Sequence, residues 1–190
     1  MKNKHKIIFF GTSEFAIPFL QALISSDYKP VLVITQDDEP AGRKQELQSP
    51  PVKIFSQEKN LDIFQPANQY ELKNKLIELS PDLCILVAYG VIVKKDILEI
   101  PKFGFINAHP SLLPKYRGPS PVQTAILNGE DKTGISLIKM DHKIDHGPII
   151  AQQEIIVGPK DNNKTLHDRL AEKKKKKLIE ILPDYISGDI

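Results

Sequence analysis

Two polar side chains that could carry acyl-group chemistry follow a short apolar segment near the middle of the chain. Asn107 and His109 come directly after the run at 103–106, and a segment stiffened by Pro110 and Pro114 follows them. Histidine is the side chain best suited to moving a proton near neutral pH. An asparagine amide can donate a hydrogen bond to an oxygen that becomes negative during acyl transfer. The pattern predicts a site in which both groups are held at the end of a strand.

A second polar segment, residues 140–148, contains two aspartates and two histidines within one expected turn. Either Asp141 or Asp145 could orient the ring of His109. Either could instead close the turn by accepting hydrogen bonds from backbone amides. The spacing leaves this choice open, and it lacks the ligand pattern of a zinc site, so no metal site is expected.

Signatures of nucleotide cofactors and of serine hydrolases are missing from the sequence. The segment Gly11-Thr12-Ser13 could cradle a phosphate at a helix N-terminus. However, the chain has no three-glycine dinucleotide fingerprint, no Gly-Lys-Ser/Thr phosphate loop and no Gly-x-Ser-x-Gly elbow. We therefore expect no tightly bound cofactor and no serine nucleophile.

Alternating strands and helices must position these side chains. The hydrophobic pattern predicts strands over 6–10, 30–35, 62–64, 83–88, 104–107, 133–140 and 148–157, and helices over 13–25, 52–59, 70–79, 94–98 and 119–127. Residues 36–51 are predicted to be a long polar loop. Repeated strand–helix units predict an α/β fold, a doubly wound and mostly parallel Rossmann-like sheet in a single domain, with ligands at the carboxyl ends of the strands.

A last helix is expected to start near Thr165, with an apolar stripe of Leu166, Leu170, Leu178, Ile181 and Leu182. Five consecutive lysines at 173–177 interrupt this stripe. A solvated or poorly packed stretch is the simplest interpretation, and a nucleic-acid contact is the alternative.

The composition is that of an ordinary globular chain, with 190 residues, 41% hydrophobic and 26% charged residues, and a net charge of +2. This balance does not demand a nucleic-acid partner, so local basic patches would have to supply such a contact. A single cysteine, Cys84, excludes an internal disulfide framework. No apolar run is long enough for a membrane span or a signal peptide, and we expect a cytoplasmic location.

Nearly the whole chain resembles the folate-dependent formyltransferases. The resemblance rests on residues 10–16, 35–36, 40–43, 49–53, 87–90, 107–118, 121–123 and 140–147. The Asn-x-His pair with the Ser-Leu-Leu-Pro that follows is specific to this superfamily. The Pro-Ala-Gly-Arg sequence at 40–43 points to its tRNA-dependent branch.

The resemblance implies an enzyme of translation initiation that transfers a formyl group from 10-formyltetrahydrofolate, a cosubstrate, to the α-amino group of methionyl-initiator tRNA. It implies that the catalytic residues are Asn107, His109 and Asp145, rather than Asp141. The implied folate contacts are Ser111, Leu112, Leu113, Pro114, Ile85, Val87, Tyr89 and Gly90, and the implied tRNA contacts are Arg43 and Lys44. A monomer is expected.

The family's tRNA-dependent enzymes also carry a C-terminal β-barrel domain, which this chain is expected to lack, so that residues 1–190 form the catalytic domain alone. Two alternatives stay open. One is a folate-dependent formyltransferase acting on a small amine, either glycinamide ribonucleotide or an amino-sugar nucleotide, because residues 109–114 and 147–150 fit that group equally well. The other is a truncated, non-catalytic folate-binding module. The sequence at 40–43 argues against the first, and retention of Asn107, His109 and Asp145 argues against the second.

Overall fold

The computed structural model describes residues 5–42 and 45–190. The chain divides into two compact units, Met1–Phe105 and Ile106–Ile190. Within the described ranges, none of the helices combines the length and the apolar character needed to cross a membrane.

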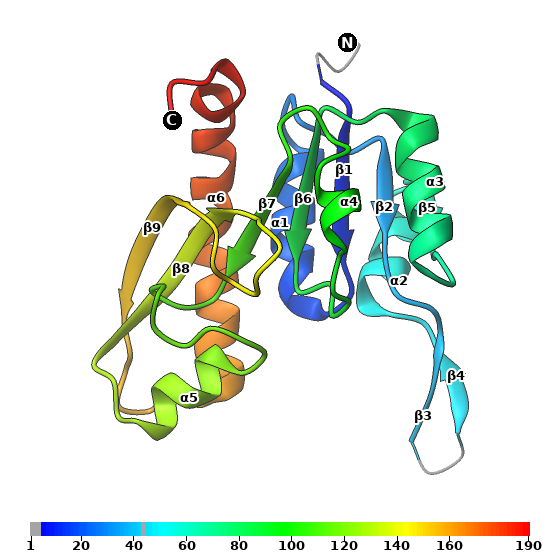
Figure 1. Ribbon diagram of the computed structural model, residues 1–190. Helices are drawn as coiled ribbons and strands as arrows, with labels where there is room; N and C mark the ends of the chain where they lie inside the picture. Colours follow the sequence, from blue (N-terminus) through cyan, green and yellow to red (C-terminus); the bar gives the residue numbers. More distant parts are fainter. Residues whose placement is uncertain (1–4, 43–44) are drawn as a thin grey trace. The chain divides into compact units, whose positions relative to one another are not determined.

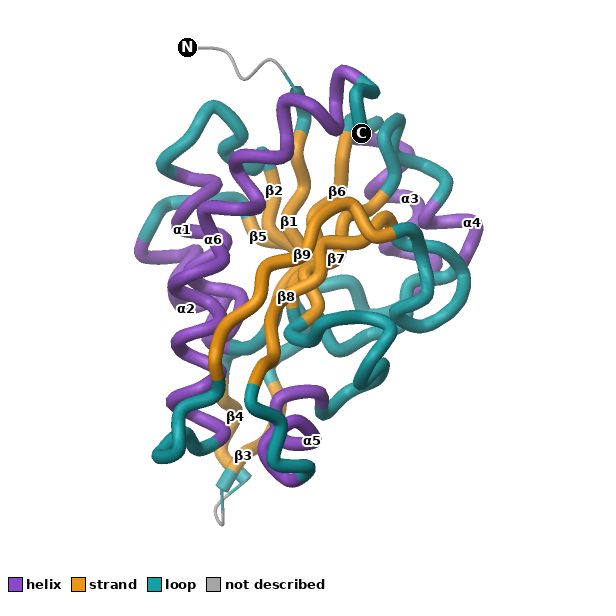
Figure 2. Tube along the Cα trace, turned by 90° about the vertical axis from the view of Figure 1, so that its left-hand side faces the viewer, coloured by secondary structure: helices purple, strands orange, loops and turns teal. Residues whose placement is uncertain are grey.

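Four parallel strands form the sheet of the first unit. Their order is β5 (Ile63–Phe64), β2 (Leu32–Ile34), β1 (Ile7–Gly11) and β6 (Leu83–Val87). Every residue of β1 and β6 is buried, as expected for strands covered on both faces. Figures 1 and 2 show α1 (Ile17–Ile24) and α2 (Pro51–Glu58) on one face and α3 (Gln69–Leu79) and α4 (Lys95–Leu98) on the other. The predicted doubly wound α/β arrangement is confirmed in this unit.

The first helical segment differs from the prediction of one helix over 13–25. A 3-10 helix, η1 (Glu14–Ala16), comes first, and α1 begins at Ile17. The cause is Pro18, which lacks an N–H and is tolerated only in the first turn of an α-helix. The helix therefore has to start next to the proline.

A two-stranded hairpin lies where the sequence was predicted to form a loop. β3 (Glu39–Ala41) pairs antiparallel with β4 (Glu46–Gln48), and Figure 1 shows this ribbon leaving the end of β2. Its base is held by Asp38, which accepts hydrogen bonds from Lys53 at 2.6 Å, Gln65 at 3.0 Å and Ser49 at 3.0 Å. The Lys53 ammonium in particular lowers the pKa of the Asp38 carboxyl. The loop prediction was wrong because the strands are short, polar and interrupted by proline.

Three antiparallel strands form the sheet of the second unit. They are β7 (Phe105–His109), β8 (Lys132–Lys139) and β9 (Ile149–Ile156), in that order. Parallel neighbours need a crossover of a dozen or more residues, and the segment between β8 and β9 is too short for one. The sequence analysis predicted a mostly parallel sheet, and the antiparallel strand pairs of that sheet lie in this second unit. α5 (Pro121–Leu127) and the long α6 (Asn163–Ser187) complete the unit, and α6 packs on β8, β9 and α5.

Helix α6 runs without a break through the lysines at 173–177. All five predicted stripe residues are buried, at exposures of 5% or less. Lys175 pairs with Glu172 at 2.6 Å, and Lys177 pairs with Glu180 at 3.6 Å. The described lysines of the run are therefore accommodated on the helix surface by carboxylates one turn away.

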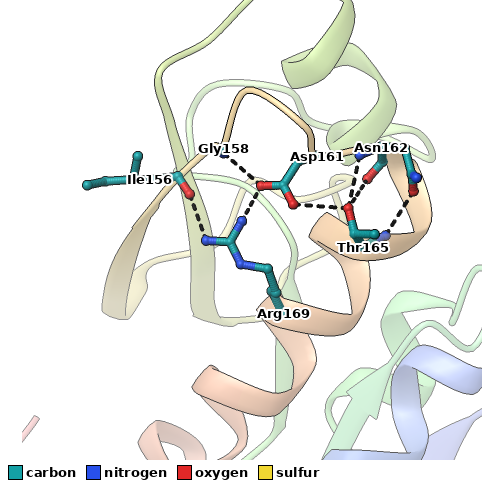
Figure 3. A network of polar contacts seen from close by, with 6 residues as sticks. All are labelled: Ile156, Gly158, Asp161, Asn162, Thr165 and Arg169. Atoms are coloured by element: carbon teal, nitrogen blue, oxygen red, sulfur yellow. Dashed lines mark hydrogen bonds and ion pairs between the residues drawn. The ribbon is translucent and has the colours of Figure 1, made fainter.

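The start of α6 is tied to the end of β9 by the polar network in Figure 3. Asn162, rather than Thr165, caps the helix, and the two residues form a reciprocal capping box. Asp161 accepts hydrogen bonds from the Gly158 N–H at 2.7 Å and from Arg169. Arg169 also donates to the Ile156 carbonyl at 3.0 Å, so that one guanidinium joins strand, turn and helix.

Candidate active site

Strand β7 places Asn107 and His109 on the same face, because side chains two residues apart in a strand point to the same side. Opposite them on β8 lie Ile138 and Ser136. Asn107 is 9% exposed and His109 is 5% exposed. The strand was predicted to end at Asn107 but continues to His109, because pairing with β8 extends that far. Both polar groups are therefore fixed by the strand itself rather than by the segment after it.

Asp145 lies within reach of both residues. Its Oδ1 accepts a hydrogen bond from the Asn107 amide at 3.1 Å, and its Oδ2 lies 3.4 Å from His109 Nδ1. The Gly118 N–H donates to the same Oδ2 at 2.9 Å. Only 11% of the Asp145 side chain is exposed, so these contacts act in a poorly hydrated environment.

The turn that carries Asp145 is constrained by its backbone. Asp145 has φ of 46°, a left-handed conformation that non-glycine residues seldom adopt. Two residues later, a Cβ on Gly147 would lie 1.8 Å from the Lys139 carbonyl oxygen. Only glycine allows this close approach to the end of β8. The close packing of the turn on the end of β8 therefore also fixes the position of the Asp145 carboxylate.

Asp141 has a different place in the same turn. Its carboxylate accepts a hydrogen bond from the Lys143 N–H at 2.8 Å and lies 2.7 Å from His146 Nδ1. The contact with His146, followed by the one with Lys143, lowers the pKa of Asp141. The geometry thus separates two aspartates that spacing alone could not separate: Asp145 reaches His109, and Asp141 closes the turn.

Both ring nitrogens of His109 are engaged. Nε2 lies 2.9 Å from the backbone carbonyl oxygen of Tyr116. A carbonyl oxygen can only accept, so this nitrogen carries a proton when the bond is made. An oxygen atom therefore already occupies the position in front of His109 Nε2. On the other side of the ring, Nδ1 lies 3.4 Å from Asp145 Oδ2, a contact that is an ion pair only when the ring is charged.

The predicted folate-contacting segment, residues 111–114, is held by two residues that the sequence analysis missed. The Ser136 hydroxyl donates to the Ser111 carbonyl at 2.7 Å and accepts from the Leu113 N–H at 2.9 Å. The Gln152 amide donates to the Leu113 carbonyl and to the Ser136 hydroxyl, each at 2.8 Å. A serine inside the apolar run of β8 was the available signal. Ser111 and Leu113 are buried, Leu112 is half-buried and Pro114 is exposed.

The other four predicted folate residues belong to the first unit, on β6 and in the turn after it. The side chains of Ile85 and Val87 are fully buried, and Tyr89 is 2% exposed. Gly90 is exposed and has φ of 84°. The Thr12 hydroxyl donates to the Tyr89 carbonyl at 2.7 Å, so the group considered for phosphate binding is used within the fold.

The two predicted tRNA contacts, Arg43 and Lys44, lie outside the described residues. Across residues 5–42 and 45–190, His, Cys, Asp and Glu side chains form no group of three or more that could hold a metal ion.

The formyl transferase sequence family matches residues 5–182 of the chain. A methionyl-tRNA formyltransferase of Methylococcus capsulatus is 43% identical, over 97% of this chain and 62% of the relative. One of Thermodesulfovibrio yellowstonii is 46% identical, over 97% of this chain and 60% of the relative. The chain thus spans about three-fifths of the length of these curated relatives.

Two solved structures share the fold. Glycinamide ribonucleotide transformylase 1 of Symbiobacterium toebii has a TM-score of 0.81 at 20% identity, over 99% of this chain and 90% of that one. An N-formyltransferase of Helicobacter canadensis, in complex with folinic acid and dTDP-3-aminofucose, has a TM-score of 0.74 at 22% identity, over 97% of this chain and 65% of that one. These similarities establish the predicted α/β formyltransferase fold for the chain.

Proposed function

Because the chain belongs to the formyl transferase family, we propose that it transfers a formyl group from 10-formyltetrahydrofolate to the α-amino group of methionyl-initiator tRNA. The names of its curated relatives support the tRNA acceptor, and the sequence at 40–43 supports the same branch. The main observation in support of formyl transfer is that one carboxylate, that of Asp145, contacts both Asn107 and His109. The proposal includes folate as a cosubstrate, a monomer and a cytoplasmic location.

The proposed reaction starts with the neutral amine. Its lone pair attacks the formyl carbon, a C–N bond forms, and the formyl oxygen becomes negative. Asn107 uses one amide hydrogen on Asp145, which leaves the second to donate to this oxyanion. His109 Nε2–H donates to the same oxygen, which replaces the Tyr116 carbonyl as its acceptor.

The second half of the reaction moves a proton. The intermediate collapses, the bond between the formyl carbon and N10 of the folate breaks, and N10 takes up the proton that the amine has lost. The Asp145 carboxylate, next to both Asn107 and His109, stabilises the imidazolium and relays the proton. The buried position of all three groups strengthens each of these interactions.

For folate binding we propose direct contacts from Leu112, Pro114 and the Gly90 backbone, which are the accessible members of the predicted set. Ser111 and Leu113 would fix the conformation of the contacting segment. Ile85, Val87 and the ring of Tyr89 would support the turn at Gly90 from the core. For tRNA binding we retain Arg43 and Lys44 as proposed contacts, and we propose that residues 1–190 act as the catalytic domain.

The test is formyl transfer from labelled 10-formyltetrahydrofolate to charged initiator tRNA, with glycinamide ribonucleotide and an amino-sugar nucleotide offered separately. We expect label in methionyl-tRNA alone. Asn107→Ala and His109→Ala should each lower kcat by about 10² to 10³ while the circular dichroism spectrum stays unchanged. Transfer only to a small amine, folate binding without turnover, or near-native rates in either variant would each contradict the proposal.

A further inference from the structure

The first unit contains a cavity of about 200 Å³ that the proposed catalytic residues do not use. It lies between the segment that follows β2 and the segment that leads into α3. Asp37, Glu39 and Tyr89 line it, together with the apolar residues Pro66 and Val91. Ligand sites for drug-sized molecules measure about 300 to 1,000 Å³, so this cavity suits a single small ring system.

Tyr89 is the buried polar group of this cavity. The residue is 2% exposed, and its ring packs edge-on against Phe10 at a centroid distance of 5.3 Å. Its backbone carbonyl is fixed by Thr12. Among the residues that the structure describes, none forms a hydrogen bond with the Tyr89 hydroxyl. Burial and the charge on Asp37 raise the pKa of Tyr89 to about 12, so the hydroxyl remains a donor at neutral pH.

Asp37 provides an acceptor in the same cavity. The carboxylate of the neighbouring Asp38 already accepts hydrogen bonds from Lys53, Gln65 and Ser49. Asp37 is exposed, and its carboxylate has no hydrogen-bonding or ion-pair partner within residues 5–42 and 45–190. The residues that line the cavity therefore include a buried tyrosine, whose hydroxyl is a donor, and a carboxylate close enough to act on its pKa.

Two other polar side chains of the cavity are already occupied. Asn68 caps α3 by accepting hydrogen bonds from the N–H groups of Tyr70 and Glu71. Gln69 donates to the Ile92 carbonyl and accepts from the Lys94 N–H. Gln36 also lines the cavity. A ligand can therefore be recognised by the hydroxyl of Tyr89, the carboxylates and the side-chain amide of Gln36.

We propose that this cavity binds the adenine base of the adenosine that ends the tRNA acceptor strand, an inference that rests on the proposed function. An adenine edge presents an amino donor beside a ring-nitrogen acceptor. This pair complements the carboxylate of Asp37 and the hydroxyl of Tyr89. Pro66 and Val91 supply apolar surface for the base. The two carboxylates repel phosphate, so the cavity would hold the base and leave the backbone of the nucleic acid outside.

The direct test measures adenosine binding to the full chain by saturation-transfer NMR, with inosine and cytidine as competing probes. We expect adenosine to bind most tightly, because inosine replaces the amino donor by a carbonyl. Asp37→Asn should weaken adenosine binding by about tenfold or more, and Tyr89→Phe by roughly 3- to 10-fold. The matched controls, Asp27→Asn and Tyr70→Phe at exposed sites outside the cavity, should bind adenosine like the unmodified chain.

A second measurement links the cavity to the acceptor. Adenosine should raise the KM for methionyl-tRNA in formyl transfer without changing kcat. Formyl transfer to methionyl-tRNA with no adenosine binding, or with equal binding of all three nucleosides, would overturn the adenine site and leave the proposed function standing. Selective adenosine binding that Asp37→Asn and Tyr89→Phe weaken, but without formyl transfer, would support the base site and overturn the proposed function.

Discussion

Asp145 and Asp141 lie four residues apart in one turn, yet their carboxylates have different neighbours. Asp145 contacts Asn107 and His109, whereas Asp141 contacts Lys143 and His146. Residue type and spacing made both aspartates candidates for orienting His109. Only the folded turn, with its left-handed Asp145 and close-packed Gly147, decides which of them faces the strand. The distinction can be tested directly with a matched pair of substitutions.

We expect Asp145→Asn to lower kcat for formyl transfer by about 10² to 10⁴, because the proposed reaction relies on the charge of Asp145 next to His109. Asp141→Asn should leave kcat close to its original value, since it only weakens the closure of the turn. Steady-state kinetics and thermal melts of both variants provide the measurement. An equal loss of kcat in the two variants would show that the turn as a whole, rather than one carboxylate, matters.

Ser136 connects three other residues through a single buried hydroxyl. One hydroxyl donates to Ser111 and accepts from Leu113 and Gln152, so all its hydrogen-bonding capacity is used. Ser136→Ala should lower the free energy of unfolding by about 1 to 3 kcal/mol, because buried backbone groups lose their partner. Urea denaturation measures this loss, with Ser13→Ala at an exposed site as the control. A change in Ser136→Ala no larger than in the control would show that the loop does not depend on this hydroxyl.

At the scale of elements, hydrophobic periodicity identified the four parallel strands of the first unit and the helices on its two faces. It failed where strands are short and polar, as in the β3–β4 hairpin. There, Pro40 and the polar residues Glu39, Glu46 and Gln48 give no alternating pattern of apolar and polar side chains. It also ended β7 two residues early, since a pattern cannot show that pairing with β8 keeps Asn107 and His109 within the strand. Asn107 and His109 could be nominated from residue type and spacing. Ser136 could be noticed as a serine within an apolar run, but the role that it shares with Gln152 could not be predicted, because that role depends on which segments the fold brings together.

The junction between β9 and α6 gives a pH-dependent prediction. The Gly158 N–H, then Arg169 and Thr165, lower the pKa of Asp161 in the folded protein. In the unfolded chain this carboxyl has its ordinary pKa. As the pH falls below about 4.5, the unfolded chain binds the proton first, so the stability that Asp161 contributes declines and is lost below its folded pKa.

The measurement is the urea midpoint of the unmodified chain and of Asp161→Asn from neutral pH down to about pH 3. The midpoint difference between the two proteins should be largest near neutrality and should shrink as the pH falls. Asp27→Asn, at an exposed site, serves as the control for a simple change of charge. A difference that stays constant over this range would mean that the network in Figure 3 does not depend on the Asp161 charge.

At the scale of the whole molecule, charge is nearly balanced, with 26 basic and 24 acidic residues. The tRNA substrate that we propose therefore could not be held by the net field of the chain and would have to meet local basic groups. Two regions of the sequence are candidates, namely Arg43 with Lys44 and the lysines at 173–177. The structure distinguishes them in part, because Lys175 and Lys177 already have carboxylate partners one turn away on α6.

Each phosphate contact adds about 0.7 to 0.9 to the slope of log affinity against log salt concentration. If Arg43 contacts the acceptor, Arg43→Ala should reduce the salt slope of KM for methionyl-tRNA by about 1 and leave kcat at saturating tRNA unchanged. Lys175→Ala, which removes the same charge from α6, should leave the slope unchanged. The opposite pattern, with an altered slope only in Lys175→Ala, would move the nucleic-acid contact to α6. It would also give the lysine run a function that its ion pairs with Glu172 and Glu180 do not explain.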